Sequence, residues 1–373
     1  MRLTIDKESF LKALNNASHA INPKNPVAIL SNFKLELNER GLDVTGSNNE
    51  ITIRSTAPYM LGDRTIITNV VRGAALVNAH LITELVRKME GTTISLDIVD
   101  NAIAKIDDGR TNFKLNCAPA DEYPDIDLEP TGTELILPCQ DLDDLVSQSA
   151  FAASGKDQRP ILAALNLEAA DNILTATATD SARLARKSIR IESDARFRTN
   201  IPARTFAEIV RLMEGALEVR MYISDRKALF VFDGTTVSTR LIPGDYPVTK
   251  SIIPTVCNYK LQVNSQELLN AMSRIAVLSA DKEYGVKLSM SEDHVEVSVK
   301  SDRHGSGNEQ IKTFQFEGDH LEVSFNSLFV IDAIKALKAE DVTICFQAEM
   351  RPFVVKNPKD DSVIELITPM RSY

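Results

Sequence analysis

The chain has 373 residues, of which 43% are apolar and 25% charged, and its formal net charge is −10. At about 100–200 residues per domain, this length predicts two to four domains with the composition of a globular protein. No segment reaches the ~20 consecutive apolar residues of a membrane-spanning helix, and the negative charge taken alone argues against binding to nucleic acid.

The N-terminal sequence MRLTIDKESF is charged where a secretion signal would be apolar, so a cytoplasmic location is expected. The cysteines lie far apart in sequence and the five histidines show no ligand spacing. The sequence therefore predicts free thiols, with neither a metal site nor a disulfide framework, and no cofactor. The cysteines are Cys117, Cys139, Cys257 and Cys345.

Three successive segments of the chain each begin with a helix-like stretch, at Asp6, Cys139 and Asn264. The third has the spacing of a capping box, Asn264 followed by Glu267. An alternating stretch follows in each segment: NFKLELNERGLDVTG, ALNLEAADNILTATATD and GVKLSMSEDHVEVSVK. Period-two alternation broken by short polar turns predicts antiparallel hairpins.

A second helix then appears three times in nearly the same form: LVNAHLITELVRKMEG (76–91), IPARTFAEIVRLMEG (201–215) and FNSLFVIDAIKALKA (325–339). Its cations Arg87, Arg211 and Lys335 are 124 residues apart, and each follows an acid by three residues, at Glu84, Glu208 and Asp332. These cations either share a functional surface or simply pair with the acid one turn earlier. Helical spacing predicts buried stripes at Leu81, Leu85 and Met89, at Phe206, Ile209, Val210 and Met213, and at Val330, Ile334 and Leu337.

Two of the segments end alike, in APADEYPDI (118–126) and IPGDYPVTK (242–250), and prolines 130 and 254 mark joints. The predicted fold class is α+β, with three repeated domains that each place two helices on antiparallel sheets. The expected domains are residues 1–129, 130–254 and 255–373. Each domain divides into two similar halves, and like units joined head to tail tend to curve and can close into a ring.

No phosphate loop, nucleophile elbow or HExxH motif occurs in the sequence. The stretch TATDSARLA (177–185) brings Asp180, Ser181 and Arg183 together without a nearby histidine, which indicates a strand end and a turn. No catalytic residue is expected. The alternative is an enzyme of unknown class whose site is divided among the three domains.

The threefold repeat and several segments together resemble the bacterial sliding clamp family, the beta subunit of DNA polymerase III. The resemblance covers the whole chain through NPVAILSNFKLEL (25–37), TATDSARLA, PGDYPVTKSIIP, FNSLFVIDAIKAL and the tail ITPMRSY. It implies a ring-shaped head-to-tail homodimer that encircles double-stranded DNA without regard to sequence. It also implies a processivity factor, a non-catalytic part of a DNA-directed DNA polymerase holoenzyme.

The partners implied are the replicative polymerase, the clamp loader and other replication and repair proteins, with no membrane. A basic lining would face phosphate while an acidic exterior keeps the ring off other DNA, which accounts for the net charge. The alternative is a scaffold that binds partner peptides without encircling DNA.

The resemblance implies three sets of site residues. The DNA-facing cations would be Lys24, Arg87, Lys156, Arg204, Arg211 and Lys335. The joint between subunits would be Phe113 against Val277 and Leu278, whose other interpretation is core within a domain. A groove for an extended apolar peptide would be formed by Arg159, Leu162, Thr179, Ser181, Arg183, Leu184, Pro247, Ile252, Asn326, Phe329, Met350, Pro352, Leu366, Thr368, Pro369, Met370 and Arg371.

The groove residues would otherwise be ordinary core. The sequence departs from the common family pattern in two places within the groove. Ser181 and Ala182 stand where a glycine and a histidine are common, and Thr368 is less apolar than the usual residue. Both differences bear on which peptide the groove prefers.

Overall fold

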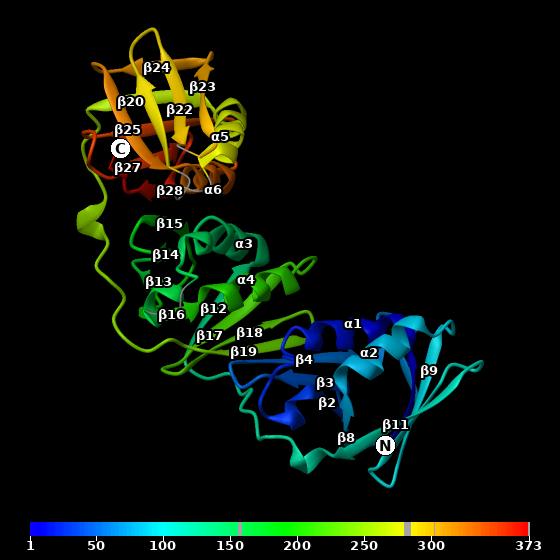
Figure 1. The fold of residues 1–373 in the computed structure, drawn as a ribbon. Helices are drawn as coiled ribbons and strands as arrows, with labels where there is room; N and C mark the ends of the chain where they lie inside the picture. Colours follow the sequence, from blue (N-terminus) through cyan, green and yellow to red (C-terminus); the bar gives the residue numbers. More distant parts are fainter. Residues whose placement is uncertain (156–158, 280–284, 302, 372–373) are drawn as a thin grey trace. The chain divides into compact units, whose positions relative to one another are not determined.

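The computed structural model describes residues 1–155, 159–279, 285–301 and 303–371 (Figure 1). The chain forms two compact units. One consists of Met1–Cys139 with Glu208–Leu241, and the other of Gln140–Ala207 with Ile242–Tyr373. Within the described residues, no helix is both long and apolar enough to cross a membrane. The same residues contain no group of three His, Cys, Asp or Glu side chains placed to hold a metal ion.

The first unit is built on a 13-stranded antiparallel sheet with the order β12-β17-β18-β19-β4-β3-β2-β8-β11-β10-β9-β1-β7. In chain order the strands are β1 (Arg2–Asp6), β2 (Asn32–Leu37), β3 (Gly41–Ser47), β4 (Ile51–Pro58), β7 (Ile67–Val71), β8 (Gly73–Asn78), β9 (Thr93–Val99), β10 (Ile103–Asp107), β11 (Asn112–Pro119), β12 (Thr133–Pro138), β17 (Glu218–Ile223), β18 (Lys227–Phe232) and β19 (Thr235–Arg240). A separate two-stranded ribbon joins β5 (Met60–Leu61) to β6 (Arg64–Thr65).

The long sheet joins distant parts of the chain through β4 and β19. Ile53 lies opposite Val237 and Thr52 opposite Ser238 in this antiparallel pair. Two helices, α1 (Lys7–Ser18) and α2 (Ala79–Lys88), lie side by side on one face of the sheet (Figure 1). They bury Phe10 and Ile82 against the strands in one apolar cluster.

The second unit contains two antiparallel sheets. The larger has nine strands in the order β16-β13-β14-β15-β28-β27-β26-β20-β24, and the smaller has the order β23-β22-β21-β25. In chain order the strands are β13 (Ala164–Ala170), β14 (Ile173–Thr179), β15 (Arg183–Arg190), β16 (Phe197–Pro202), β20 (Tyr259–Asn264), β21 (Gly285–Met290), β22 (Val295–Ser301), β23 (Gly305–Ile311), β24 (Phe314–Glu317), β25 (Leu321–Asn326), β26 (Asp341–Phe346), β27 (Phe353–Asn357) and β28 (Asp360–Ile367).

The remaining long helices are α3 (Cys139–Ser147), α4 (Ala203–Leu212), α5 (Ser265–Ser279) and α6 (Ser327–Leu337). Helices α5 and α6 pack against each other, and both contribute to a core that contains Phe325, Phe346 and Phe353 (Figure 1). The three expected hairpins are confirmed as β2–β3, β13–β14 and β21–β22. The threefold repeated helix is confirmed as α2, α4 and α6.

A strand that runs directly into a capped helix recurs through the fold. Asn78 ends β8 and accepts a hydrogen bond from the Leu81 N–H, and Asn326 ends β25 and accepts one from the Leu328 N–H. Asn264 does the same for the Glu267 N–H at the start of α5. A short side-chain acceptor at this position satisfies one of the free N–H groups of the first helical turn, which fixes where each helix begins.

Two expectations about helices need correction. Leu81 is 48% exposed, because the side of α2 that packs on the core carries Ile82 and Val86 instead. The Glu267 carboxylate does not complete a capping box and instead accepts hydrogen bonds from the N–H groups at 312 and 313.

The prediction of free thiols is wrong for two of the four cysteines. Cys257 and Cys345 form a disulfide across 88 residues of sequence. Neither spacing nor periodicity marks this pair, because the fold brings the two residues together. Cys117 and Cys139 are free.

Candidate functional site

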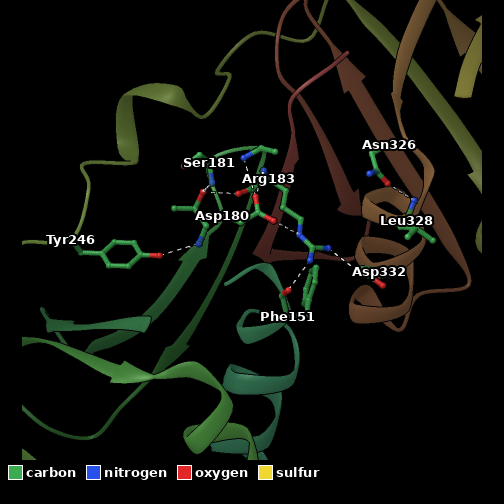
Figure 2. A network of polar contacts seen from close by, with 10 residues as sticks. Phe151, Asp180, Ser181, Arg183, Tyr246, Asn326, Leu328 and Asp332 are labelled. Carbon is green, nitrogen blue, oxygen red and sulfur yellow. Dashed lines mark hydrogen bonds and ion pairs between the residues drawn. The ribbon is translucent and has the colours of Figure 1, made fainter. Parts of the chain in front are cut away.

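The turn between β14 and β15 is fixed by its own side chains. The Asp180 Oδ1 atom accepts hydrogen bonds from the N–H groups of Ala182 at 2.9 Å and Arg183 at 3.0 Å. The Tyr246 hydroxyl accepts a further hydrogen bond from the Thr179 N–H at 2.9 Å (Figure 2). Burial raises the pKa of Tyr246 to about 12, so its hydroxyl stays neutral in this role. The turn is therefore held both from within and from the segment that contains Tyr246.

Arg183 connects this turn to two other segments of the second unit (Figure 2). Its Nε donates to Asp180 Oδ2 at 3.1 Å and its Nη1 to Asp332 Oδ2 at 2.6 Å. Its Nη2 donates to the Phe151 carbonyl oxygen at 2.9 Å. The guanidinium also lies over the ring of Phe329, 4.6 Å from the ring centroid. A planar, multiply donating cation suits this arrangement, because one side chain satisfies two carboxylates and a carbonyl at once.

A buried carboxyl group lies near this network. Glu365 on β28 is opposite Ala185 of β15 and is 2% exposed. Its Oε1 atom has no hydrogen-bond partner among the described residues. Burial raises the pKa of Glu365 well above its ordinary value, while the Arg183 charge acts in the opposite direction. Glu365 therefore keeps its proton at pH values where an exposed glutamate is ionised.

The tail of the chain runs beside the same turn. Leu366 lies opposite Leu184 in the β15–β28 pair. The Thr368 N–H donates to the Ala182 carbonyl oxygen at 2.9 Å, which continues the pairing past the end of β28. The apolar C-terminal segment expected from the sequence therefore begins as a strand paired on both sides, with β15 and β27, and continues next to the β14–β15 turn.

The predicted groove residues all belong to the second unit, but they differ in exposure. Those that face solvent are Arg159, Ser181, Pro247, Ile252, Met350, Thr368 and Arg371. Those that are partly buried are Arg183, Asn326, Phe329, Pro352 and Met370. Those that are buried are Leu162, Thr179, Leu184, Leu366 and Pro369. The exposed Arg159 donates to the Ser181 hydroxyl at 2.9 Å, so a polar pair of side chains borders the apolar residues.

The predicted DNA-facing cations are exposed wherever the structure describes them. This holds for Lys24, Arg87, Arg204, Arg211 and Lys335, whereas Lys156 lies outside the described residues. Arg87 pairs with Glu84 and Arg211 with Glu208, each three residues earlier on its own helix. Lys335 differs, because Asp332 is bound by Arg183 instead. Pairing within the helix therefore applies to two of the three repeats.

The residues expected at the subunit joint lie at exposed or half-exposed positions. Phe113 lies opposite Ile106 in the β10–β11 pair and is 37% exposed. Val277 is 75% exposed near the end of α5, while Leu278 is half-buried against the core of its own domain. Leu278 therefore packs within its own domain, in addition to any contact that it makes across the expected joint between subunits.

The structure adds residues that the sequence reasoning did not assign to the site. These are Asp332, which the helical spacing pairs with Lys335 on its own helix, and Phe151 and Glu365, which no sequence pattern marks. Tyr246 did carry a signal, since a Tyr-Pro pair recurs in APADEYPDI and IPGDYPVTK. Asp332 and Glu365 carried none, because Arg183, whose charge acts on both, lies on a distant strand.

Comparison with known proteins gives one consistent result. The family models of the DNA polymerase III beta subunit match in order: the N-terminal domain over residues 1–127, the central domain over 136–248 and the C-terminal domain over 250–371. The beta sliding clamp of Bacillus subtilis is 30% identical over 100% of both chains, and its crystal structure aligns with a TM-score of 0.96. The DNA polymerase III beta chain of Streptococcus pneumoniae, also 30% identical over 100% of both chains, aligns with a TM-score of 0.95.

Proposed function

Because the chain belongs to the DNA polymerase III beta-subunit family, the beta sliding clamps, we propose that two copies join head to tail in a ring around duplex DNA. The chain is a DNA sliding clamp with three clamp domains, the non-catalytic processivity subunit of DNA polymerase III. The observation that carries the proposal is the match along the whole chain, at 30% identity, with a sliding clamp of nearly the same structure.

The ring acts by enclosing DNA, so its contacts with phosphate are weak enough to allow sliding. Exposed lysines and arginines on α2, α4 and α6 supply those contacts, while the net charge of −10 discourages binding of the outer surface to DNA. Base contacts would fix the ring at one sequence and are not expected. The ring works in the cytoplasm, and its domains are residues 1–129, 130–254 and 255–373.

The second part of the proposal concerns partners. The turn held by Asp180, Arg183 and Tyr246 borders a groove that receives a short apolar peptide of the replicative polymerase, and the clamp loader and repair proteins use the same groove. Its apolar surface comes from Pro247, Ile252 and Met350, which are exposed to solvent. A tethered polymerase stays at high local concentration near the primer end.

Retention on circular DNA tests whether the ring encloses its substrate. The clamp is loaded onto a nicked plasmid by its clamp loader, and the DNA is separated from free protein by gel filtration. We expect clamp to remain with circular DNA and to dissociate after one restriction cut, because a ring slides off a free end.

A peptide-binding scaffold predicts a different result. Its retention would be the same before and after the cut, or absent in both. Either result would overturn the enclosing ring, and peptide titration would then show whether partner binding survives by itself.

A further inference from the structure

A row of four side chains crosses the large sheet of the second unit. Leu184 on β15 lies opposite Leu366 on β28, which lies opposite Val354 on β27, which in turn lies opposite Cys345 on β26. Leu184, Val354 and Leu366 are 1%, 1% and 3% exposed and form one apolar cluster. Two members of this row, Leu184 and Leu366, belong to the proposed peptide groove.

The segment between β19 and β20, residues 241–258, covers part of this row and is called the linker below. Its Ile253 packs against the cluster formed by Leu184, Val354 and Leu366. The neighbouring Ile252 faces solvent, at 47% exposure. A peptide that is to reach Leu184 and Leu366 therefore meets Ile253 already packed against the cluster that they form with Val354.

The linker is attached to the same sheet on both sides of Ile253, and at its end the Asn258 N–H donates to the Phe346 carbonyl oxygen. Before Ile253, the Tyr246 hydroxyl accepts a hydrogen bond from the Thr179 N–H on β14. After it, Cys257 is bridged to Cys345, the last member of the row. Four residues of extended chain reach at most ~14 Å, so the bridge keeps Ile253 close to the row. Held covalently, Ile253 competes with any incoming apolar side chain at a high effective concentration.

The bridge is accessible to reductants from the linker side, because Cys257 is exposed while Cys345 is partly buried. A thiolate of a dithiol reductant attacks the Cys257 sulfur, the bond between the two cysteine sulfurs breaks, and Cys345 leaves as a thiolate that takes a proton. The second thiol of the reductant then attacks the mixed disulfide and releases Cys257 as a thiol. The reductant ends as a disulfide, so two electrons and two protons pass to the protein.

We propose that Cys257–Cys345 is a redox latch that controls access to the peptide groove, an inference that rests on the proposed function. With the bridge intact, Ile253 stays on the cluster of Leu184, Val354 and Leu366, and partner peptides bind weakly. After reduction the linker between Tyr246 and β20 moves more freely, the apolar row becomes available, and peptide affinity rises. Thiol–disulfide exchange thereby links partner binding to the redox state of the compartment.

Peptide titration in both redox states tests the latch. The probe is a fluorescent decapeptide from the replicative polymerase of the same organism, chosen to contain two adjacent apolar residues. The wild-type clamp and Cys257→Ser are equilibrated in oxidised glutathione or in dithiothreitol before titration. Alkylation followed by mass measurement counts free thiols in each sample. Cys117→Ser, which changes a thiol outside the bridge, is the matched control.

We expect the oxidised wild-type clamp to have two fewer free thiols than the reduced protein and to bind the peptide about tenfold more weakly. Cys257→Ser should bind as tightly as the reduced wild type in both buffers, and Cys117→Ser should behave as wild type. Four free thiols in oxidised wild type, or equal affinity of the bridged and reduced forms, would overturn the latch alone. Absence of peptide binding in every form would overturn the proposed groove and the latch with it.

Discussion

Arg183 explains how a solvent-facing turn becomes a rigid part of the second unit. Three nitrogens of one side chain donate to Asp180, Asp332 and the Phe151 carbonyl oxygen, which belong to three separate segments. The Arg183 side chain is 14% exposed, so its donor groups are largely shielded from water and from salt, whereas the Asp332 side chain is 41% exposed. If one of these donors is lost, a partly buried acceptor is left without a hydrogen bond. This costs more free energy of folding than replacing donor and acceptor together by apolar groups.

This geometry predicts that Arg183→Lys destabilises the fold although the charge is preserved. A lysine ammonium can reach one of the two carboxylates, but it cannot also donate to the Phe151 carbonyl oxygen or stack on the Phe329 ring. We expect the free energy of unfolding to fall by about 1–2 kcal/mol, measured in urea. Arg196→Lys, at an exposed pair with Asp171, should change it little. An equal effect of both variants would show that the three hydrogen bonds of the Arg183 guanidinium have no special role in stability.

Glu365 predicts a pH dependence of stability. A carboxyl whose pKa is raised by folding binds more protons in the folded than in the unfolded state above its ordinary pKa of 4.5. Stability from this group is therefore lost as pH rises from about 4.5 through the raised value. Glu365→Gln cannot ionise, so we expect its urea midpoint relative to wild type to be higher at pH 8 than at pH 5. Glu349→Gln, at an exposed position, is the control, and a difference independent of pH would contradict the argument.

At the scale of the element, short-range pattern and structure agree closely. Period-two alternation predicted the hairpins, and the short polar side chains that precede the helices set their first residues, as Asn264 does for α5. These features depend on neighbours a few residues away, which is why the sequence alone indicated them. The error at Leu81 arises because helical spacing gives an apolar stripe but not which side of it is buried, and in α2 the core covers the side that carries Ile82 and Val86.

The three copies of the repeated helix also differ in a way that predicts function. Arg87 and Arg211 are paired within their helices, whereas Lys335 has no ion-pair partner among the described residues. A cation without a carboxylate partner gains more free energy from binding a phosphate than a cation that must first break an ion pair.

Lys335→Glu should therefore weaken binding of a fluorescent duplex more than Arg87→Glu does. It should also flatten the dependence of log affinity on log salt by about 0.9 for each phosphate that the ring no longer neutralises. Lys359→Glu, in the turn between β27 and β28, is the control. An unchanged salt slope for Lys335→Glu would place this helix away from DNA.

The tail predicts a separation of folding from partner binding. Deleting residues 369–373 removes Met370, whose N–H donates to the Ser324 carbonyl oxygen, but leaves β28 intact up to Ile367. We expect a folded clamp that still remains on circular DNA and binds the polymerase decapeptide at least tenfold more weakly, since an anchor of a groove typically contributes ~2 kcal/mol. Equal affinity of the full-length and shortened chains would show that the peptide binds elsewhere.

At the scale of the whole molecule, the sequence indicated the repeat but not the long-range pairings. The β4–β19 and β15–β28 pairs join strands about 180 residues apart, and Cys257 meets Cys345 only because the sheet places them together. The partner of Asp332 was missed for the same reason: an acid three residues before a lysine is a plausible pair until a distant arginine is brought closer. The residues of the proposed groove were predicted from the family resemblance, whereas the hydrogen bonds around Arg183 could be found only in the folded chain.

The joint between subunits gives the last prediction. Val277 is 75% exposed, so Val277→Asp should leave the fold of its own domain intact, whereas Leu278 also packs within that domain. If Val277 becomes buried against Phe113 of a second copy, an unpaired carboxylate there would cost several kcal/mol, and Leu278→Asp added to it would cost more. We expect Val277→Asp alone to sediment as a monomer at micromolar concentration while its far-UV circular dichroism stays that of the folded chain. Val248→Asp places the same charge at another valine with 75% exposure, away from the expected joint, and should remain a dimer. A dimeric Val277→Asp and a dimeric double variant would exclude this end of α5 from the joint, because no interface of modest size tolerates two buried, unpaired carboxylates.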